Sequence, residues 1–482
     1  MSTILDLQPQ AVWHHFHQLT QIPRPSHHEA AVQQHVLDEA QRLGLPAERD
    51  AAGNIRVRKP ASEGMSAAPG VILQAHLDMV PQKNADKVHD FARDPVTTIV
   101  REDGWVTADG TTLGADNGIG AAMILAVLAD DTLVHPPLEA LFTATEETGM
   151  GGAMGLQAGW LDGRYLINLD YEDEGELCIG CAGGLDGSFV VPHGSRAVHL
   201  PGYRLRVRGL RGGHSGVDIH RLRGNAIRIL AQALVAIGAT DIVGISGGNL
   251  RNAIPREAEA WLGLADEAAA GAARAVLASL VPEIRQGLDA DDQGLEITLV
   301  PAEAVTGVID DAGRVLDVLR ALPHGVDRMS AAMPGLVETS TNLAAVHSQD
   351  GEVHIHCLLR SSSDTQKQDL ADRMAAVLRL AGGRWHFSGD YGGWLPQPES
   401  RLVEVFQQTG EAIFGRKPPI RAIHAGLECG ILSRHYPHWQ MISLGPTITG
   451  AHSPDEAVKI DTVGRAWQWL ERSLAVLATR RG

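Results

Sequence analysis

The segment Gly70-Val-Ile-Leu-Gln-Ala-His76-Leu-Asp78 decides the fold of this chain. Its short apolar run is typical of a strand buried on both faces, as the strands of parallel sheets are. His76 and Asp78 follow two residues apart on an extended segment, so both side chains leave the same face. Polar residues at the end of a buried strand lie where open α/β sheets place their sites.

The same pattern recurs further along the first part of the chain. Apolar runs at 138–145 and 165–169 predict two more buried strands, and 118–130 predicts a buried helix. Strands that alternate with helices indicate an α/β core with a largely parallel sheet. The two strands are followed or closed by acidic residues, namely Glu146-Glu147 and Asp170.

From about residue 186 the pattern changes. Tyr203–Gly209 and Glu352–Arg360 alternate polar and apolar residues, which predicts antiparallel strands with one buried face. Helical segments at 224–237 and 266–280 lie between them, and the glycine-rich stretch Ser388–Trp394 is interpreted as a linker.

After this stretch the first pattern resumes, with helices predicted at 400–414 and 462–479 around a strand. We therefore expect a catalytic domain in two parts, 1–185 and 396–482. An α+β lid domain, 186–395, is expected between them. At 482 residues the chain exceeds the usual size of a single hydrophobic core, which also favours two domains.

The composition favours a cytoplasmic enzyme. A hydrophobic content of 44% with 21% charged residues is that of a soluble globular protein. A net charge of −17 argues against nucleic acid or an anionic membrane surface as a partner. No signal peptide and no apolar run long enough to span a bilayer is recognisable. Four cysteines in a chain of this length do not indicate a disulfide framework.

Five separated segments offer side chains that bind divalent metals. They are His76-Leu-Asp78, Asp116 in a Gly-Ala-Asp-Asn-Gly loop, Glu146-Glu147, Asp170, and His452 in Gly-Ala-His-Ser-Pro-Asp-Glu. Carboxylate and imidazole ligands together suit zinc, cobalt or manganese better than calcium or an iron–sulfur cluster. One carboxylate is left over to act as a base, so the set indicates a metal-assisted hydrolase.

Each of these signals has a simpler explanation when it is taken alone. Asp116, directly before a helix, is more often an N-cap residue. The adjacent acids Glu146 and Glu147 are costly unless cations compensate them, and a buried unpaired Asp170 would be expensive. Because the segments occur together, four of them at strand ends or helix starts of one sheet, they predict a metal centre.

The motifs around these residues resemble those of the co-catalytic zinc peptidases, a family that includes carboxypeptidase G and the aminoacylases. They are Ala75-His-Leu-Asp-Met-Val-Pro81, Thr111-Thr-Leu-Gly-Ala-Asp-Asn-Gly118, Thr145-Glu-Glu-Thr-Gly149, Asn168-Leu-Asp170 and Ala451-His-Ser-Pro-Asp-Glu456. The resemblance is greatest to the aminoacyl-histidine dipeptidase (Xaa-His dipeptidase, carnosinase-like) branch.

Four further motifs extend this resemblance over essentially the whole chain. They are Cys181-Ala-Gly-Gly-Leu-Asp-Gly187, Arg211-Gly-Gly-His-Ser-Gly216, Gly247-Gly-Asn-Leu-Arg-Asn-Ala-Ile-Pro255 and His424-Ala-Gly-Leu-Glu-Cys-Gly430.

The resemblance implies a di-metal hydrolase core with two divalent ions per chain, zinc by expectation, with cobalt or manganese as alternatives. It gives Asp116 the role of a carboxylate that bridges both ions. His76 and Asp170 would complete one metal site, and Glu147 with His452 would complete the other.

The same resemblance assigns Asp78 to orient His76 and Glu146 to act as the general base. It also implies substrate-binding roles for residues of the expected lid. His214 would approach the developing oxyanion, and Asn252 with Arg360 would hold the terminal carboxylate of the substrate. Gly426 would offer its backbone to the substrate.

The expected function is therefore hydrolysis of dipeptides by a metal-bridged water, with Xaa-His dipeptides, including β-alanyl-histidine, as the expected substrates. An aminoacylase or another small-molecule amidohydrolase of the same fold is the alternative. A non-catalytic binding protein would require the loss of a ligand or of the base, and all of them are present. A small peptide is the only expected partner apart from a second subunit, since the resemblance allows a homodimer.

Overall fold

The computed structural model of the protein describes residues 3–479. The chain divides into two compact units. Among the described residues, the first unit is formed by 3–180, 395–422 and 428–479, and the second by 181–394 and 423–427. No helix among the described residues is long and apolar enough to cross a membrane.

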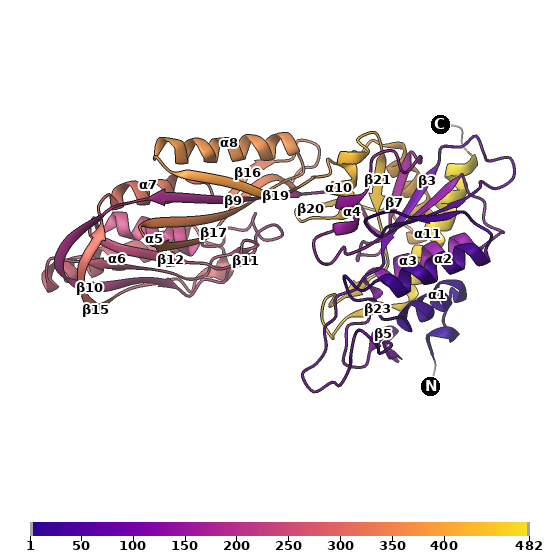
Figure 1. Ribbon diagram of the computed structural model, residues 1–482, viewed down its shortest axis with the longest axis horizontal. Helices are drawn as coiled ribbons and strands as arrows, with labels where there is room; N and C mark the ends of the chain where they lie inside the picture. Colours follow the sequence, from indigo (N-terminus) through magenta and orange to yellow (C-terminus); the bar gives the residue numbers. More distant parts are fainter. Residues whose placement is uncertain (1–2, 480–482) are drawn as a thin grey trace. The chain divides into compact units, whose positions relative to one another are not determined.

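An eight-stranded sheet forms the centre of the first unit (Figure 1). Its strands, in spatial order, are β1 (Ala47–Arg49), β2 (Ile55–Lys59), β6 (Leu138–Thr143), β3 (Val71–His76), β7 (Tyr165–Asn168), β21 (Gln440–Ser443), β8 (Leu177–Cys181) and β20 (Ile420–Ile423). The four strands β6, β3, β7 and β21 run parallel to one another, whereas β1, β2 and β8 pair antiparallel. The predicted α/β class is confirmed, with parallel pairing limited to the centre of the sheet.

The parallel strands β3, β6 and β7 at the centre of the sheet are covered on both faces. Every residue of β3, β6 and β7 is buried, as the continuous apolar runs predicted. Helices cover the sheet: α1 (Gln10–Thr20), α2 (Ala30–Arg42), α3 (Ala115–Ala129), α4 (Gly151–Gly155), α9 (Arg401–Phe414), α10 (Glu428–His435) and α11 (Ile460–Thr479). Among them α3 is buried almost throughout and packs against β3 and α1.

A small four-stranded sheet completes the first unit. Its order is β22 (Ile448–Thr449), β23 (Ala457–Lys459), β5 (Trp105–Ala108) and β4 (Thr98–Val100). The loop between β22 and β23 contains His452. A 3-10 turn, η1 (Ile4–Asp6), precedes α1.

The second unit contains an antiparallel sheet of nine strands. Their order is β15 (Glu296–Ile309), β10 (Ser195–Arg208), β14 (Ala258–Gly263), β12 (Ile242–Gly247), β17 (Val337–Gln349), β18 (Glu352–Ser361), β9 (Gly183–Pro192) and β19 (Arg384–Tyr391), with β16 (Gly325–Met329) paired to β17. The other elements are α5 (Ala226–Ala236), α6 (Glu267–Gln286), η2 (Ala290–Asp292), α7 (Ala312–Ala321), α8 (Asp364–Leu380), and the short pair β11 (Gly213–His214) and β13 (Ala253–Ile254).

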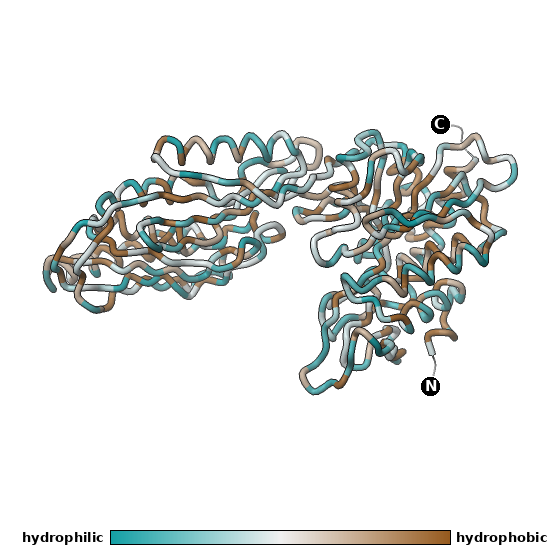
Figure 2. Tube along the Cα trace, in the orientation of Figure 1, coloured by the Kyte–Doolittle hydropathy of each residue, from teal (hydrophilic) through white to brown (hydrophobic). Residues whose placement is uncertain are grey.

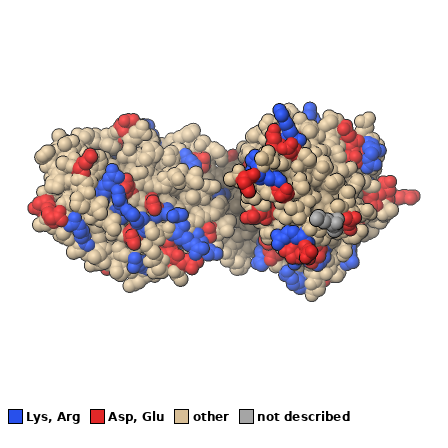
Figure 3. Space-filling model, turned by 90° about the horizontal axis from the view of Figure 1, so that it is seen from below, with Lys and Arg blue, Asp and Glu red and all other residues tan. Residues whose placement is uncertain are grey.

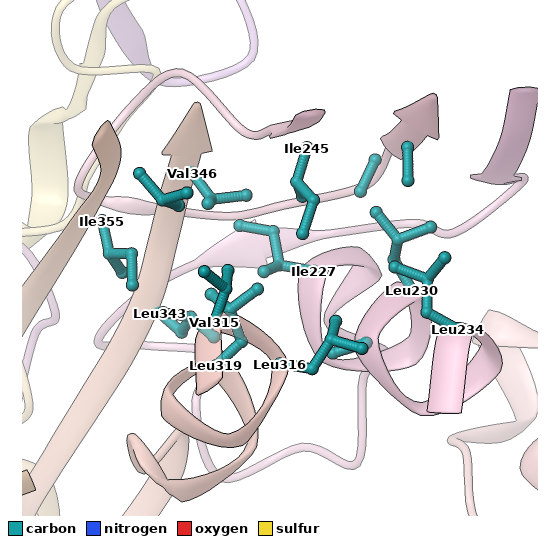
Figure 4. Close-up of a cluster of buried hydrophobic side chains, with 14 of the residues drawn as sticks. Ile227, Leu230, Leu234, Ile245, Val315, Leu316, Leu319, Leu343, Val346 and Ile355 are labelled. Atoms are coloured by element: carbon teal, nitrogen blue, oxygen red, sulfur yellow. The ribbon is translucent and has the colours of Figure 1, made fainter. Parts of the chain in front are cut away.

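The core of the second unit lies between this sheet and its helices. Figure 4 shows Ile227 of α5 and Val315 of α7 directed toward Leu343 of β17 and Ile355 of β18. Burial alternates along β9 and along the first half of β18, and hydrophilic and hydrophobic residues alternate along the trace of this unit (Figure 2). The polar–apolar alternation in the sequence thus reflects a sheet with one face packed against helices and the other face more open to solvent.

The interpretation of Ser388–Trp394 as a linker is wrong for its first residues. Strand β19 extends to Tyr391 and pairs with β9, with an irregular register between Ser388 and Tyr391. Gly389 has a φ of 62° at this irregularity, a backbone conformation that glycine adopts readily. A glycine that permits a bulge inside a strand looks, in the sequence, like a loop residue.

Candidate active site

Adjacent parallel strands bring the acids and one histidine of the first unit together. Strand β3 ends at His76, Glu146 and Glu147 follow the end of β6, and Asp170 follows the end of β7. Because β6, β3 and β7 are neighbours in the sheet, their carboxyl ends share one edge. Two further elements complete the group: Asp116 lies in the first turn of α3, and His452 lies between β22 and β23.

Asp116 is at the centre of this group. Its Oδ1 lies 3.1 Å from Nε2 of His76, and its Oδ2 lies 3.2 Å from Nε2 of His452. Each imidazole also faces a second carboxylate: His76 Nε2 is 3.4 Å from Oδ1 of Asp170, and His452 Nε2 is 2.9 Å from Oε2 of Glu147. One ligand atom from each of His76, Asp116 and Glu147 lies within 4.8 Å of the others. The structure thus brings together all five residues that the sequence predicted as ligands.

The electrostatics of the group favour positive charge. Burial raises the pKa of Asp170 to about 6 and raises that of Glu146 well above its usual range. Hydrogen bonds to Asp116 and Glu147 raise the pKa of His452 to about 11. Burial alone would lower the pKa of His76, but the charge of Asp170 and the hydrogen bond to Asp116 raise it. Bound divalent cations would balance the negative charge of these buried acids in the same way as protonated imidazoles do.

Two carboxylate oxygens show that the residues fit a metal. Oε1 of Glu147 is buried and accepts no hydrogen bond from any residue within 3–479, and the buried Oδ1 of Asp170 has the imidazole of His76 beside it at 3.4 Å. A buried carboxylate oxygen without a partner is costly, and a metal ion would satisfy it. The mixture of imidazole and carboxylate donors is one that zinc, cobalt and manganese bind.

Asp78 connects His76 to the glutamate pair. Its Oδ1 lies 3.4 Å from Nδ1 of His76 and accepts the backbone N–H of Glu146 at 2.9 Å. Its Oδ2 accepts the backbone N–H of Glu147 at 3.2 Å and the hydroxyl of Ser26 at 2.7 Å. Burial would raise the pKa of Asp78, but the interactions with His76 outweigh it and hold the pKa at about 2. The carboxylate therefore stays charged and can orient a ligand imidazole.

His214 and Arg360 belong to the second unit, and hydrogen bonds within that unit hold both side chains. Nδ1 of His214 accepts the backbone N–H groups of Gly216 at 3.2 Å and Val217 at 3.0 Å, so the proton of the neutral ring is on Nε2. Arg360 is buried, with Nε 3.3 Å from Oγ of Ser215. Among residues 3–479 no carboxylate forms an ion pair with this guanidinium.

The surroundings of Asn252 and Gly426 say less about a role in substrate binding. The backbone carbonyl of Asn252 accepts the N–H of Ser215 at 2.8 Å, but its side chain is exposed. Gly426 is half-buried in the segment 423–427 of the second unit. The neighbouring His424, to which the sequence analysis gave no role, is buried with its Nε2 2.7 Å from Oγ of Ser340.

Three further charged residues of the first unit are buried in and around this group although no role was predicted for them: Arg24, Glu428 and Glu456. Glu428 accepts hydrogen bonds from Gln74 Nε2 and Thr143 Oγ1, both at 2.6 Å, and burial raises its pKa to about 7. A single signal in the sequence could have found it, since Gln74 is a polar residue inside an otherwise apolar buried strand.

The sequence of this chain matches peptidase family M20/M25/M40 over residues 72–475. The chain belongs to this peptidase family. It is 43% identical to the cytosol non-specific dipeptidase of Escherichia coli, over 98% of this chain and 99% of that protein.

Two solved structures resemble that of this chain. An aminoacylhistidine dipeptidase from Vibrio alginolyticus has a TM-score of 0.93 and 42% identity, with 98% of both chains covered. A tripeptidase from Staphylococcus aureus shares the fold, with a TM-score of 0.61 and 15% identity over 98% of this chain and 100% of that one. The resemblance to metallopeptidases inferred from the motifs is therefore confirmed.

Proposed function

We propose that this member of the M20 family is a metal-dependent dipeptidase that hydrolyses the peptide bond of Xaa-His dipeptides, including β-alanyl-histidine. The observation that carries the proposal is the carboxylate of Asp116, which faces His76 with one oxygen and His452 with the other. The names of the two similar proteins, a non-specific dipeptidase and an aminoacylhistidine dipeptidase, support the substrate class.

The proposed cofactor is a pair of divalent ions, zinc in the first place. Asp116 would contact both ions, His76 and Asp170 would hold one, and Glu147 and His452 would hold the other. When bound, such a pair polarises a peptide carbonyl and lowers the pKa of water. The unpartnered Oε1 of Glu147 and the contact of Asp170 with His76 support their roles as ligands.

Glu146 is the proposed general base. Within the described residues its carboxylate has no hydrogen bond or ion pair, whereas its backbone is held by Asp78. The carboxylate is therefore available to take a proton from the attacking water and pass it to the leaving amine.

The proposed substrate contacts come from the second unit. The Nε2–H of His214 would donate to the developing oxyanion. Arg360 and Asn252 would bind the terminal carboxylate of the dipeptide, for which a guanidinium is well suited, and Gly426 would offer its backbone. In this proposal residues 1–185 and 396–482 form the catalytic domain and residues 186–395 form the lid domain.

Location and assembly are part of the same proposal. The similar protein of Escherichia coli is named a cytosol dipeptidase, and we propose a cytoplasmic location for this chain. A small peptide is the proposed substrate partner, and assembly as a homodimer is compatible with the proposal.

Metal dependence and substrate class can be tested together. Metal-free protein should be inactive on β-alanyl-histidine and other dipeptides, and about two equivalents of zinc, cobalt or manganese should restore hydrolysis. Activity should be lost when the substrate amine is N-acetylated. Full activity of metal-free protein would refute the mechanism, and a preference for N-acetylated substrates would favour the aminoacylase alternative.

A further inference from the structure

A buried arginine lies directly behind the proposed ligands. Arg24, in the segment between α1 and α2, is 2% exposed. Its Nη1 donates to the carbonyls of Leu77 at 2.8 Å and Asp78 at 3.0 Å, and its Nη2 donates to the carbonyl of Gly114 at 2.5 Å. The first two carbonyls follow His76, and the third precedes Asp116. One guanidinium therefore joins the two segments that carry these side chains.

Two glycines make room for this guanidinium. A Cβ atom at Gly114 or at Gly118 would lie 2.6 Å from Nη2 of Arg24, which is too close for two non-bonded atoms. Gly114 also has a φ of 70°, which disfavours other residues. The glycines on either side of Asp116 are thus explained by the close approach of Arg24.

Glu456 binds the other polar groups of the same turn. It is 2% exposed, and its Oε2 accepts the backbone N–H groups of Leu113 at 2.8 Å and Gly114 at 2.9 Å. Its Oε1 accepts the N–H of Asp116 at 3.1 Å. Arg24 therefore binds a carbonyl of this turn, and Glu456 binds the N–H groups of the same turn. The two residues lie near opposite ends of the sequence.

We infer that Arg24 and Glu456 are positioning residues that hold Asp116 against His76 and His452 for metal binding. The inference rests on the metal site proposed above. Asp116 has non-helical backbone angles (φ −79°, ψ 109°) at the start of α3, so the regular hydrogen bonds of the helix do not fix it. The carbonyl of Gly114 also accepts the N–H of Gly118 at 3.1 Å, and the two buried side chains supplement this hydrogen bond at the turn.

The chemistry of the two side chains explains why they suit this task. A planar guanidinium donates in fixed directions to several acceptors, whereas a lysine ammonium does not. The carboxylate accepts three N–H groups and leaves the Asp116 side chain free to face the imidazoles. Partners of this kind, one layer behind the ligands, typically change metal affinity by about 10–100-fold when they are removed.

The test measures metal affinity rather than activity. Metal-free wild type and the variants Arg24→Met, Arg24→Lys and Glu456→Gln are titrated with Zn²⁺ alone by calorimetry and with Co²⁺ alone by visible absorption. Thermal unfolding of each metal-free protein is measured in parallel. The matched control is Arg56→Met, because Arg56 on β2 is also a buried arginine of the first unit, 7% exposed, with Glu139 and Trp160 as neighbours.

We expect the three site variants to bind both ions about 10–100-fold more weakly than wild type. Arg56→Met should unfold at a lower temperature with unchanged metal affinity. Because both residues hold one turn, the double variant Arg24→Lys/Glu456→Gln should lose less affinity than the product of the two single effects.

Several results would overturn the inference. Wild-type affinity in Arg24→Lys and Glu456→Gln would do so, even if Arg24→Met failed to fold. An equal loss of affinity in Arg56→Met would show a general effect of stability, and fully multiplicative losses would show that the two residues do not act on one turn. If wild type itself bound neither ion, the proposed metal site would fail instead.

Discussion

The two adjacent glutamates of the site have different surroundings although they are neighbours in the sequence. Oε2 of Glu147 lies 2.9 Å from His452, and its Oε1 is buried without a hydrogen bond among the described residues. The side chain of Glu146 has no such partner in that part of the chain, and only its backbone is held by Asp78. Both residues follow the end of β6, where Thr145 has a φ of 51° and a turn begins at Glu147, and only Glu147 reaches His452.

The first prediction separates these two roles. Glu146→Gln should retain its metal ions but lose about 10²–10⁴-fold in turnover, because a general base contributes about that much. Glu147→Gln should instead weaken metal binding, since it removes an anionic ligand. Metal content by atomic emission and kcat for each variant provide the measurement. Equal metal loss in both variants would contradict the assignment.

The second prediction concerns Arg360, whose buried guanidinium has hydroxyl partners in Ser215 and Tyr391. Arg360→Ala should reduce kcat/KM for a dipeptide far more than for the matching dipeptide amide. A carboxylate accepts charge-assisted hydrogen bonds from arginine that a neutral amide does not match. If both substrates slow by the same factor, Arg360 has only a structural role.

At the level of elements, a chain of buried polar side chains crosses the four parallel strands beneath the site. Ser443 of β21 donates to Asn168 of β7, and Asn168 donates to Gln74 of β3 at 2.5 Å. Gln74 and Thr143 of β6 both donate to Glu428 at 2.6 Å. The donors all point toward the carboxylate, so Glu428 fixes the orientation of both amides. Gln74 and Asn168 each stand two residues before a proposed ligand.

The third prediction tests this polar chain. Gln74→Leu leaves the amide of Asn168 and the carboxylate of Glu428 each without one partner in a buried setting. It should lower the free energy of unfolding by about 2–5 kcal/mol. Urea unfolding followed by far-UV circular dichroism measures the effect. Gln34→Leu, on the exposed face of α2, is the control and should change stability by less than about 0.5 kcal/mol.

At the scale of the whole molecule, the chain returns to the second unit late in the sequence. Residues 423–427 belong to that unit although the residues before and after them belong to the first. His424 in this segment is buried against Ser340. Burial and the nearby charge of Arg360 lower its pKa to about 3, so the folded protein keeps the imidazole neutral.

The fourth prediction follows from this neutral histidine. Below its ordinary pKa of about 6.5 His424 takes up a proton in the unfolded chain but not in the folded one. The stability associated with the neutral ring is therefore complete above pH 6.5 and is lost as the pH falls toward 3. His424→Gln should reduce the pH dependence of unfolding between these values by up to one proton, about 1.4 kcal/mol per pH unit.

Urea unfolding between pH 4 and pH 7 measures this dependence. His386→Gln, at an exposed position on β19, serves as the control and should unfold with the pH dependence of wild type. An unchanged dependence in His424→Gln would mean that His424 is protonated in the folded state.

Charge over the molecular surface is mixed. Figure 3 shows acidic and basic side chains interspersed on the displayed face of each unit, and ion pairs such as Arg204–Glu259 and Arg421–Glu176 join many of them.

The sequence by itself determined the α/β class and the buried central strands, and it offered five segments with candidate metal ligands; the separate roles of Glu146 and Glu147 came only from the family resemblance. It could do so because continuous apolar runs specify doubly buried strands, and because the residues that follow such strands meet at one edge of a sheet. Long local motifs added the peptidase family, which the comparisons confirmed.

Only the tertiary structure decided what holds these ligands in place. Arg24 and Glu456 are 432 positions apart, and Gln74 and Glu428 are 354 apart, so no local pattern could pair them. A buried arginine or glutamate looks like a surface residue in the sequence, because its burial depends on partners that only folding supplies. The segments that carry the proposed ligands can thus be found from local motifs, whereas the spacing of these side chains depends on long-range contacts between segments that meet only in the folded chain.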